Sequence, residues 1–332
     1  MSFKFNVTTT TTTAGGNSKD VDWDGLNDHV VKAANTEKKS RSIPGIVSGI
    51  YDLGEQNRDD AEIDTSDKEF KVKHPDYDGS DSAKKLLVEG RAGSYFKEEG
   101  GKEYFCYPQK PVQQVAVAVD FPQILVNKGQ FFGNSSPLPL RLLLNGEFSI
   151  DGTRVVGKPY NIVEKKYDDG TWAFAKNSGL HKLADACGVL DDNGYFSKDN
   201  IGDLLGKAAQ FTIRVWMKPS KKDASKKYFT EEIALSGMVP EGITIPEFDE
   251  SILHGINLMG ENDPSAVKQL RYCVKNTIKR ANNYEVSDLK KVIDEQEGGD
   301  KPAQKPAAKP IVTKPKPQQP EADDDFSEDS PF

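Results

Sequence analysis

The chain has 332 residues, which is enough for one large domain or two ordinary ones. Hydrophobic residues make up 36% of it and charged residues 29%, so a core can form only if part of the chain stays outside it. The net charge of −8 is an average over segments of opposite sign. The overall charge therefore does not indicate a polyanionic partner such as nucleic acid.

The cysteines and the hydropathy exclude further classes of protein. Cys106, Cys187 and Cys273 are far apart and form no Cys-x-x-Cys pair, which argues against a disulfide framework or a four-cysteine zinc site. No apolar run approaches the roughly 20 residues that span a bilayer, and the first residues lack an apolar signal core. We therefore expect a soluble intracellular protein with three ordinary buried thiols, no membrane association, no metal and no cofactor.

Residues 1–42 are expected to form an N-terminal extension. They begin with a polar stretch that includes a threonine run, for which we expect an exposed and mobile lead-in. A short amphipathic helix should follow, with an apolar side formed by Trp23, Leu26, Val30 and Val31. A strand-like run over 43–51 then leads into residues 52–82, which hold eleven acidic residues against four basic ones. We interpret this part as an exposed acidic insertion near residues 54–100.

Strand patterns dominate the middle of the chain. In the run over 112–121, valines alternate with alanine, glutamine or aspartate, which is the period of a strand. Similar runs predict strands over 139–148, 160–163, 209–217 and 228–239. One segment, 176–189, instead predicts a helix closed by Gly188. Its apolar residues recur at helical spacing: Leu180, Leu183, Ala184 and Cys187.

The last third of the chain predicts helices and then a tail. Helices are expected over 264–282 and 286–296 within a helical segment at 241–298, with Asp263 as a cap and Pro264 in the first turn. Residues 301–320 contain six prolines and almost nothing apolar. We therefore expect residues 299–332 to be a disordered proline-rich linker followed by an acidic tail.

These elements predict a mainly β fold with added helices. About five strands, with a helix before the last two, suit an OB-like five-stranded barrel within residues 43–240. The expected strands lie near 46–53, 112–121, 139–148, 210–217 and 228–239. A β-sandwich remains an alternative. In a barrel of this type, one face of the sheet and the connecting loops can hold a nucleic-acid strand.

Binding a single strand requires cations for phosphates and aromatic rings for bases. Between residues 141 and 229 there are fifteen lysines and arginines against eleven acids. Arg214 and Trp216 stand out because they are out of phase with the apolar face of their strand. The alternative is that the lysines are solvated and the aromatic residues belong to the core. The candidate DNA-contacting residues are Arg141, Arg154, Lys158, Tyr160, Lys165, Lys166, Tyr167, Trp172, Arg214, Trp216, Lys218, Lys221, Lys222, Lys226, Lys227 and Tyr228.

The C-terminal tail has the chemistry of a peptide ligand. A phenylalanine at the chain terminus can enter a pocket, while its carboxylate and the preceding acids meet arginines or lysines around that pocket. The alternative is an acidic tail that only aids solubility. The candidate partner-binding residues are Asp323, Asp324, Asp325, Phe326, Glu328, Asp329, Pro331 and Phe332.

Two segments support a family resemblance. The sequence Asp323-Asp324-Asp325-Phe326 with Ser330-Pro331-Phe332, behind its Pro/Gln/Lys linker, resembles the tail of bacterial single-stranded-DNA-binding proteins. The region 172–215, with a helix ending in Ala-Cys-Gly and then Leu-Leu-Gly-Lys before a strand, is similar to a pattern in bacteriophage single-stranded-DNA-binding proteins. The length, the acidic insertion and the two C-terminal helices depart from the bacterial proteins and favour a phage relative.

The resemblance implies sequence-tolerant binding of single-stranded DNA during phage replication or recombination. It also implies that the tail recruits replication or recombination proteins, and that the protein works on DNA in the cytoplasm of an infected bacterial cell. A replication or recombination adaptor that does not itself bind DNA is the alternative.

The chain carries few signs of catalysis. It contains no GxxxxGK[ST], HExxH or GxSxG motif. Pairs of aspartates at 59–60, 168–169 and 191–192 could be proposed as metal ligands of a nuclease, but they lie in turn sequences that favour aspartate for local reasons. We therefore expect no enzyme activity, no catalytic residue and no small-molecule substrate.

Overall fold

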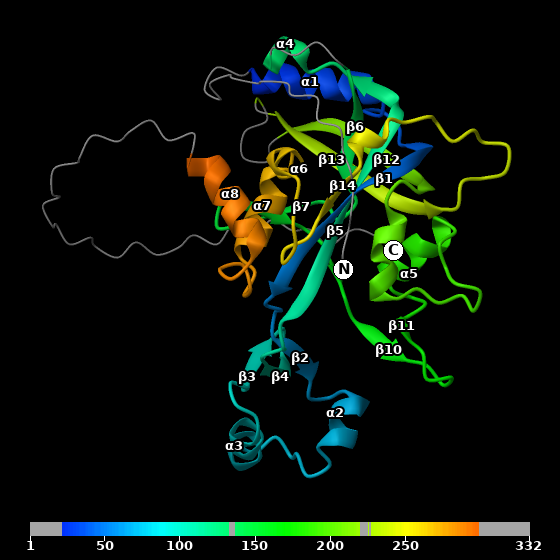
Figure 1. Cartoon of the computed structure of the whole chain (residues 1–332). Coiled ribbons are helices and arrows are strands. Elements are labelled where there is room, and N and C mark those ends of the chain that lie inside the picture. The colour runs from blue at the N-terminus through cyan, green and yellow to red at the C-terminus, as the bar shows by residue number, and fades with distance from the viewer. Residues whose placement is uncertain (1–21, 133–136, 220–224, 226, 299–332) are drawn as a thin grey trace, which may run out of the picture.

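The computed structural model describes residues 22–132, 137–219, 225 and 227–298, and these form a mainly β structure with several helices (Figure 1). Five strands make the central sheet in the order β13–β12–β1–β5–β6, all antiparallel. Their bounds are β1 Arg41–Gln56, β5 Val112–Val126, β6 Leu138–Leu143, β12 Ala208–Pro219 and β13 Lys227–Gly237. Two short strands extend it: β9 (Tyr160–Asn161) pairs with β5, and β14 (His254–Ile256) pairs with β1.

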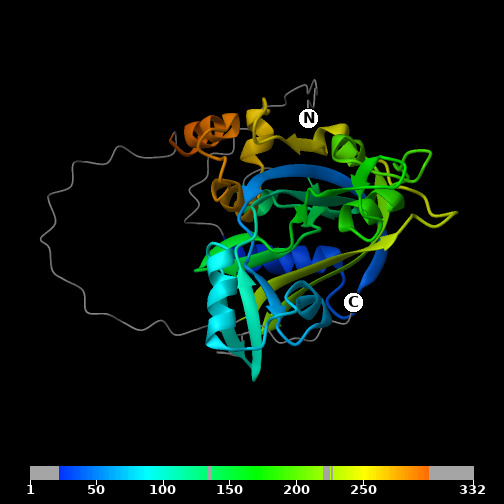
Figure 2. The same cartoon turned by 90° about the horizontal axis from the view of Figure 1, so that it is seen from below.

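Both faces of the central strands are covered, which explains their near-continuous apolar sequence. On β5, Val115, Val117 and Val119 face a cluster with helices α1 (Trp23–Ala34) and α5 (Gly179–Ala186). Ala116 and Ala118 alternate with them and face a second cluster. Figure 2 shows α1 on one side of β1 and β5, and the C-terminal helices on the other.

The second cluster is built by the C-terminal helices, α6 (Pro264–Lys268), α7 (Tyr272–Lys279) and α8 (Asp288–Gly298). Val274, Ile278 and Leu289 are completely buried against Tyr51 and Leu53 of β1. The segment 241–298 is therefore packed on the sheet. The expected cap is confirmed, because the carboxylate of Asp263 accepts the N–H of Ser265 at 2.8 Å.

The sheet is not closed into a barrel. Strands β6 and β13 approach each other, but no backbone ladder joins them within the described ranges. Side chains span this seam instead. The guanidinium group of Arg271 donates to the carbonyl of Arg141 on β6 at 2.7 Å and binds the carboxylate of Glu231 on β13. It also donates to Glu147 Oε1 at 3.2 Å.

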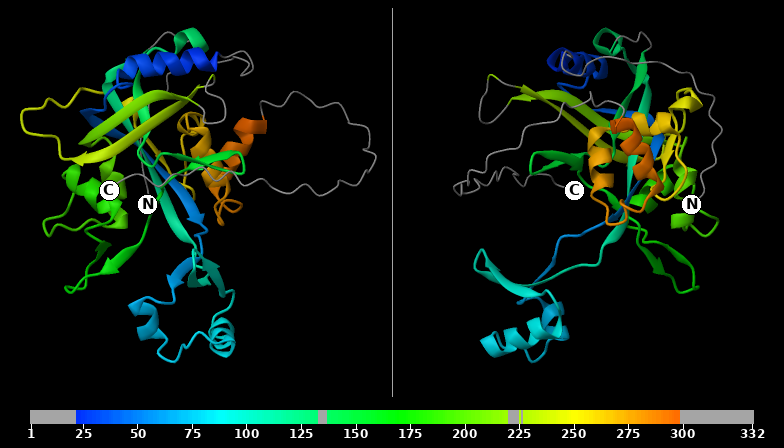
Figure 3. Two further views of the ribbon diagram at one scale, coloured as in Figure 1. Left: turned by 180° about the vertical axis from the view of Figure 1, so that it is seen from behind. Right: turned by 60° about the vertical axis from the view of Figure 1, so that its left-hand side comes forward.

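The expected acidic insertion is a small folded module at the end of β1 and β5, and Figure 3 shows it standing away from the central sheet. Its sheet has the order β2–β4–β3, with β2 Ala61–Asp64, β3 Tyr95–Glu99 and β4 Lys102–Tyr107, and its helices are α2 (Lys68–Lys73) and α3 (Asp81–Gly90). Phe70 and Phe105 are buried among other rings. The acids visible in the sequence lie around an aromatic core.

The remaining elements lie between β5 and β14. They are the short helix α4 (Gly129–Phe132), the hairpin β7–β8 (Glu147–Ile150 and Thr153–Val156), the hairpin β10–β11 (Glu164–Lys166 and Trp172–Phe174), and the 3-10 helices η1 (Lys198–Leu204) and η2 (Glu250–Ile252).

Four expected elements were wrong in extent. The strand over 139–148 is two strands, because Asn145 and Gly146 form a turn in which the Asn145 side chain accepts the N–H of Val117 at 2.8 Å. The helix over 264–282 is two helices, because Arg271 is extended between them, with ψ at 147°. The helix over 176–189 is only α5, and the strand over 160–163 is only β9.

Candidate nucleic-acid interface

One solvent-facing surface gathers several of the expected DNA-contacting residues. The antiparallel register of β12 and β13 sets Trp216 opposite Thr230, Arg214 opposite Glu232 and Lys218 opposite Tyr228. The alternate residues of β12, Phe211, Ile213 and Val215, are fully buried on the other side. We call this surface the β12–β13 face, and define it by Arg214, Trp216, Lys218, Tyr228, Thr230 and Glu232.

The centre of this face is a cation–π pair. The guanidinium carbon of Arg214 lies 4.4 Å from the centroid of the Trp216 ring. Such pairs contribute about 0.5–1 kcal/mol at exposed sites, enough to hold both side chains in one arrangement. Nε of Arg214 is buried and has no hydrogen-bond partner among the described residues. The pair therefore places a guanidinium group against an aromatic plane on this face.

Two lysines that were not predicted as contacts lie on the segment that runs beside β12. The hydroxyl of Thr36 accepts the N–H of Val215 at 2.7 Å, and Arg41 pairs with Ile213. The turn between them, with Lys38 and Lys39 exposed, must therefore lie alongside Arg214. The only signal in the sequence is two adjacent lysines before a strand, and their position depends on the pairing of β1 with β12.

The charge on this surface is positive. The face itself carries Arg214 and Lys218 against Glu232, and the exposed Lys38, Lys39 and Lys227, with Glu37, lie on the segments beside it. Tyr228, at the start of β13, is 42% exposed. The expected contacts Lys221, Lys222 and Lys226 fall in the β12–β13 connection and lie outside the described residues.

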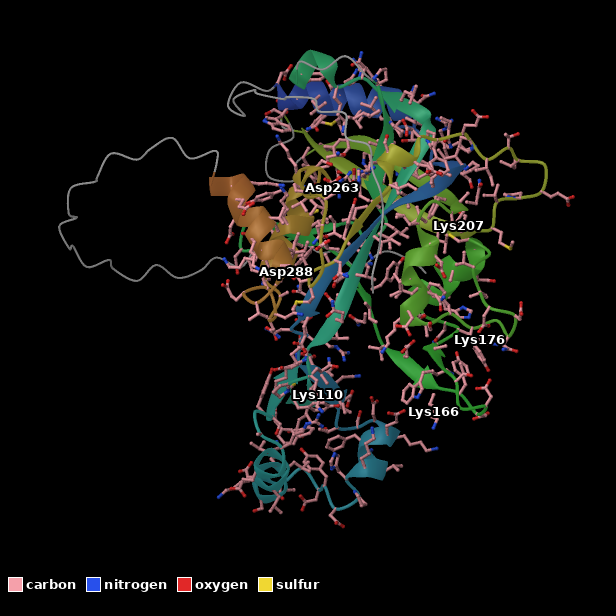
Figure 4. All side chains as sticks on the ribbon, viewed as in Figure 1. Lys110, Lys166, Lys176, Lys207, Asp263 and Asp288 are labelled. Atoms are coloured by element: carbon pink, nitrogen blue, oxygen red, sulfur yellow. The ribbon has the colours of Figure 1, made fainter. Side chains whose placement is uncertain are left out.

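A second group of expected residues lies on the β10–β11 hairpin. Lys166 is paired with Trp172, which is 57% exposed, and the ammonium of Lys165 lies 4.3 Å from the ring centroid of Tyr167. Figure 4 shows Lys166 on the same side of the molecule as Lys176 and Lys207, both of which are exposed. This basic edge is built from elements distinct from the β12–β13 face.

A pocket of about 720 Å³ opens beside this hairpin, with Trp172 and Tyr195 in its wall. Its charged lining is Glu164, Asp191, Asp199 and Lys198. Three carboxylates against one ammonium disfavour a phosphate inside the pocket. The pocket therefore does not extend the cationic surface.

Four expected contacts have other surroundings. Arg141 donates to both carboxylate oxygens of Asp120, at 2.7 and 2.9 Å, and to the carbonyl of Ile252 at 2.8 Å. Tyr160 packs against Gly179, and burial raises the pKa of its phenol to about 12. Arg154 is paired with Glu147 at 2.8 Å, and Lys158 is exposed after β8. None of the four belongs to the β12–β13 face.

The remaining features concern the cysteines, metal-binding groups, the helices and the tail. Cys106 and Cys273 are buried, Cys187 is half-buried, and all three are free thiols. In the ranges that the structure covers, no three His, Cys, Asp or Glu side chains are grouped to hold a metal ion. None of the helices described is both long and apolar enough to cross a membrane. The candidate tail residues at 323–332 lie outside the described part of the chain.

Searches of protein-family models, curated proteins and solved structures found no match to this chain.

Proposed function

We propose that this protein binds single-stranded DNA without sequence preference through the β12–β13 face. The observation that carries the proposal is the Arg214–Trp216 pair on the solvent side of a β-sheet, with lysines on both flanks. Trp216 and Tyr228 would stack on bases, which tolerates any sequence because every base has a π-face. Arg214 and the lysines at 38, 39, 218 and 227 would neutralise phosphates.

The sheet topology supports an OB-type core as part of this proposal. The order β13–β12–β1–β5–β6 is that of an OB barrel opened between its third and fifth strands, and α5 lies between the third strand and the fourth. In this interpretation, the Arg271 side chain joins β6 to β13 where a closed barrel would have a backbone ladder. Folds of this type bind nucleic acid on the face of their second and third strands and on the loops that join the first strand to the second and the fourth to the fifth. The connection between β12 and β13 corresponds to the last of these loops.

The acidic tail completes the proposal. Its resemblance to bacterial single-stranded-DNA-binding proteins supports recruitment of replication or recombination proteins, and the whole chain would act by binding, without turnover. Deleting residues 323–332 should leave DNA affinity equal or higher, because an acidic segment competes with DNA for cations, and should abolish partner binding. If the deletion removes DNA binding, the proposed division between face and tail is wrong.

The direct test is a fluorescence titration of the full chain with labelled oligo-dT at several salt concentrations. Single-stranded binding should weaken with salt by a slope of about −0.7 per neutralised phosphate, so five cations predict roughly −3.5. No binding at low salt would overturn the proposal and favour the adaptor. Cleavage of the oligonucleotide with Mg²⁺ or Mn²⁺ would contradict a purely binding role.

The chain offers a matched control for the location of the site. Trp216 and Trp172 are both accessible tryptophans on strands, one on the β12–β13 face and one on the β10–β11 hairpin. Trp216→Ala should weaken binding and Trp172→Ala should not. The reverse result would move the site to the hairpin.

A further inference from the structure

Helix α7 presents an outward surface of cations around an exposed aromatic ring. Its buried side is formed by Cys273, Val274, Thr277 and Ile278. The other side carries Tyr272, Lys275, Asn276, Lys279 and Arg280, at the spacing of one helix face. Tyr272 is 70% exposed, and residues 264–282 contain no aspartate or glutamate. We call these five residues the α7 face.

The lysines of this surface repel one another. Burial lowers the pKa of the Lys275 ammonium, Lys279 and Lys268 lower it further, and Glu297 opposes them. Glu297 is already bound to Lys279, with Oε1 at 2.5 Å from Nζ. The carboxylate of Glu297 therefore has to balance the charges of Lys268, Lys275 and Lys279. A phosphate placed here would reduce the repulsion, which a neutral or cationic ligand would not.

The α7 face lies on the same side of the sheet as the β12–β13 face. Ala116 and Ala118 of β5 point to the C-terminal helices, and strand pairing through β1 puts Arg214 and Trp216 of β12 on that side too. Arg271, next to Tyr272, binds Glu231 of β13. Glu231 pairs with the buried Val215, so this contact lies on the side of β13 opposite to Trp216. The start of α7 is therefore joined to β13 itself, the strand that borders the proposed site.

We infer that the α7 face is a second contact surface for the same single strand of DNA. The strand would pass from the β12–β13 face across β13, with a base stacked on Tyr272 and phosphates bound by Lys275, Lys279 and Arg280. This inference rests on the proposed function. Charge complementarity, an exposed ring and continuity with the first face favour nucleic acid over a protein partner.

The test uses the full chain and two lengths of oligo-dT. An oligonucleotide of about 6 nucleotides can occupy only one face, whereas one of about 25 exceeds the roughly 4–16 nucleotides held by a single OB fold. The triple variant Tyr272→Ala, Lys275→Gln, Arg280→Gln should bind the short oligonucleotide as the original chain does. Its affinity for the long one should fall about tenfold or more. The salt slope for the long one should become shallower by about 1.4, for two lost phosphate contacts.

A matched control replaces Lys290 and Lys291 of α8 by glutamine, because these lysines are paired with Asp294 and Asp288. The control should bind both lengths normally, and urea unfolding should verify that both variants are folded. If the triple variant binds the long oligonucleotide like the original chain, the inference is overturned. Tighter binding would also overturn it, because it would mean that the α7 face holds acidic residues of the tail.

The same titrations distinguish failure of the proposed function from failure of the second contact surface. Trp216→Ala should weaken binding of both lengths. If the original chain binds neither length, the proposed function fails. If only the α7 variant is without effect, the proposed function stands and the second surface is rejected.

Discussion

Arg141 and Arg214 are in the same sheet, and their side chains have opposite surroundings. Arg141 donates hydrogen bonds to Asp120, which is 2% exposed, and to a backbone carbonyl. Arg214 is half-buried, with its guanidinium carbon 4.4 Å from the centroid of the Trp216 ring, and the carboxylate opposite it, Glu232, is exposed. A guanidinium group whose donors are bound inside the protein stabilises the fold, whereas one stacked on an aromatic ring at the surface can contact a ligand. The sequence pattern indicated that Arg214 faces away from the core, but it did not indicate that Arg141 is paired with Asp120.

Replacing Arg141 tests the structural half of this comparison. Arg141→Met should lower the free energy of unfolding by about 3–5 kcal/mol, because the buried carboxylate of Asp120 loses its partner. Urea unfolding followed by circular dichroism measures it. The variant that still folds should bind oligo-dT with unchanged affinity at low temperature. A stable variant with weakened DNA binding would mean that Arg141 belongs to the interface after all.

Replacing Trp216 tests the functional half. Trp216→Ala should weaken binding of oligo-dT by about 1–3 kcal/mol, or roughly 5- to 150-fold, because one base loses its stacking platform. Stability should change far less than in Arg141→Met, since the ring is partly exposed. Fluorescence titration and urea unfolding on the same preparation give both numbers. A large loss of stability with unaltered affinity would mean that Trp216 supports the fold and does not bind DNA.

The surroundings of His254 also predict that stability depends on pH. Burial lowers the pKa of His254 and the nearby Arg141 lowers it further, while Gln269, Asp120 and Asp263 oppose the shift. The unfolded chain binds this proton near pH 6.5 and the folded chain only at lower pH. The contribution of His254 to the free energy of unfolding is therefore fully present above about pH 6.5 and is lost as the pH falls. The slope cannot exceed about 1.4 kcal/mol per pH unit.

The measurement for His254 is urea unfolding between pH 7 and pH 5, above the range in which ordinary carboxyl groups titrate. His254→Gln should flatten the curve in that window while keeping a polar group opposite Gln269. An equally steep curve in the variant would assign the titration to another group.

The smallest effect should come from an exposed ion pair. Arg154 binds Glu147 at 2.8 Å, but its side chain is 63% exposed, and Glu147 keeps Arg271 as a second partner. Arg154→Gln should therefore change the free energy of unfolding by less than about 0.5 kcal/mol. A loss above about 1 kcal/mol would show that the charge network of the seam extends to the surface.

Much of the secondary structure was predictable, because the relevant signals are local. The alternation in β12 and β5, the helical spacing in α1, and the Asp263 cap all act over a few residues, and each element appears where its pattern indicates. Errors arose at turns, where one side chain such as Asn145 makes bonds to distant backbone groups. The module at 57–111 was read as an acidic insertion because its buried rings are few and spread between charged residues.

The candidate site was predictable only in part. Period-two spacing indicated that Arg214 and Trp216 face away from the core, and the structure gives them that position. Lys38 and Lys39 were missed because strand pairing brings them there across more than 170 residues of chain. Arg141 was included because nothing in its own strand reveals that Asp120 lies opposite. The outward surface of α7 was hidden because the break at Arg271 and the packing of α6–α8 were not visible.

Hydrophobic spacing acts within each element, so it predicted the five main strands of the central sheet, helices α1 and α5, and the alternation that divides β12 into a buried and a solvent-facing side. Which charges are paired with one another could not be predicted in this way. Pairing depends on register and on distant segments meeting, as Arg271 meets Glu231 and Arg141 at the seam. The role of a charged side chain depends on the atoms within a few ångströms of it. Those atoms are brought there by the fold and not by the residues next to it in the sequence.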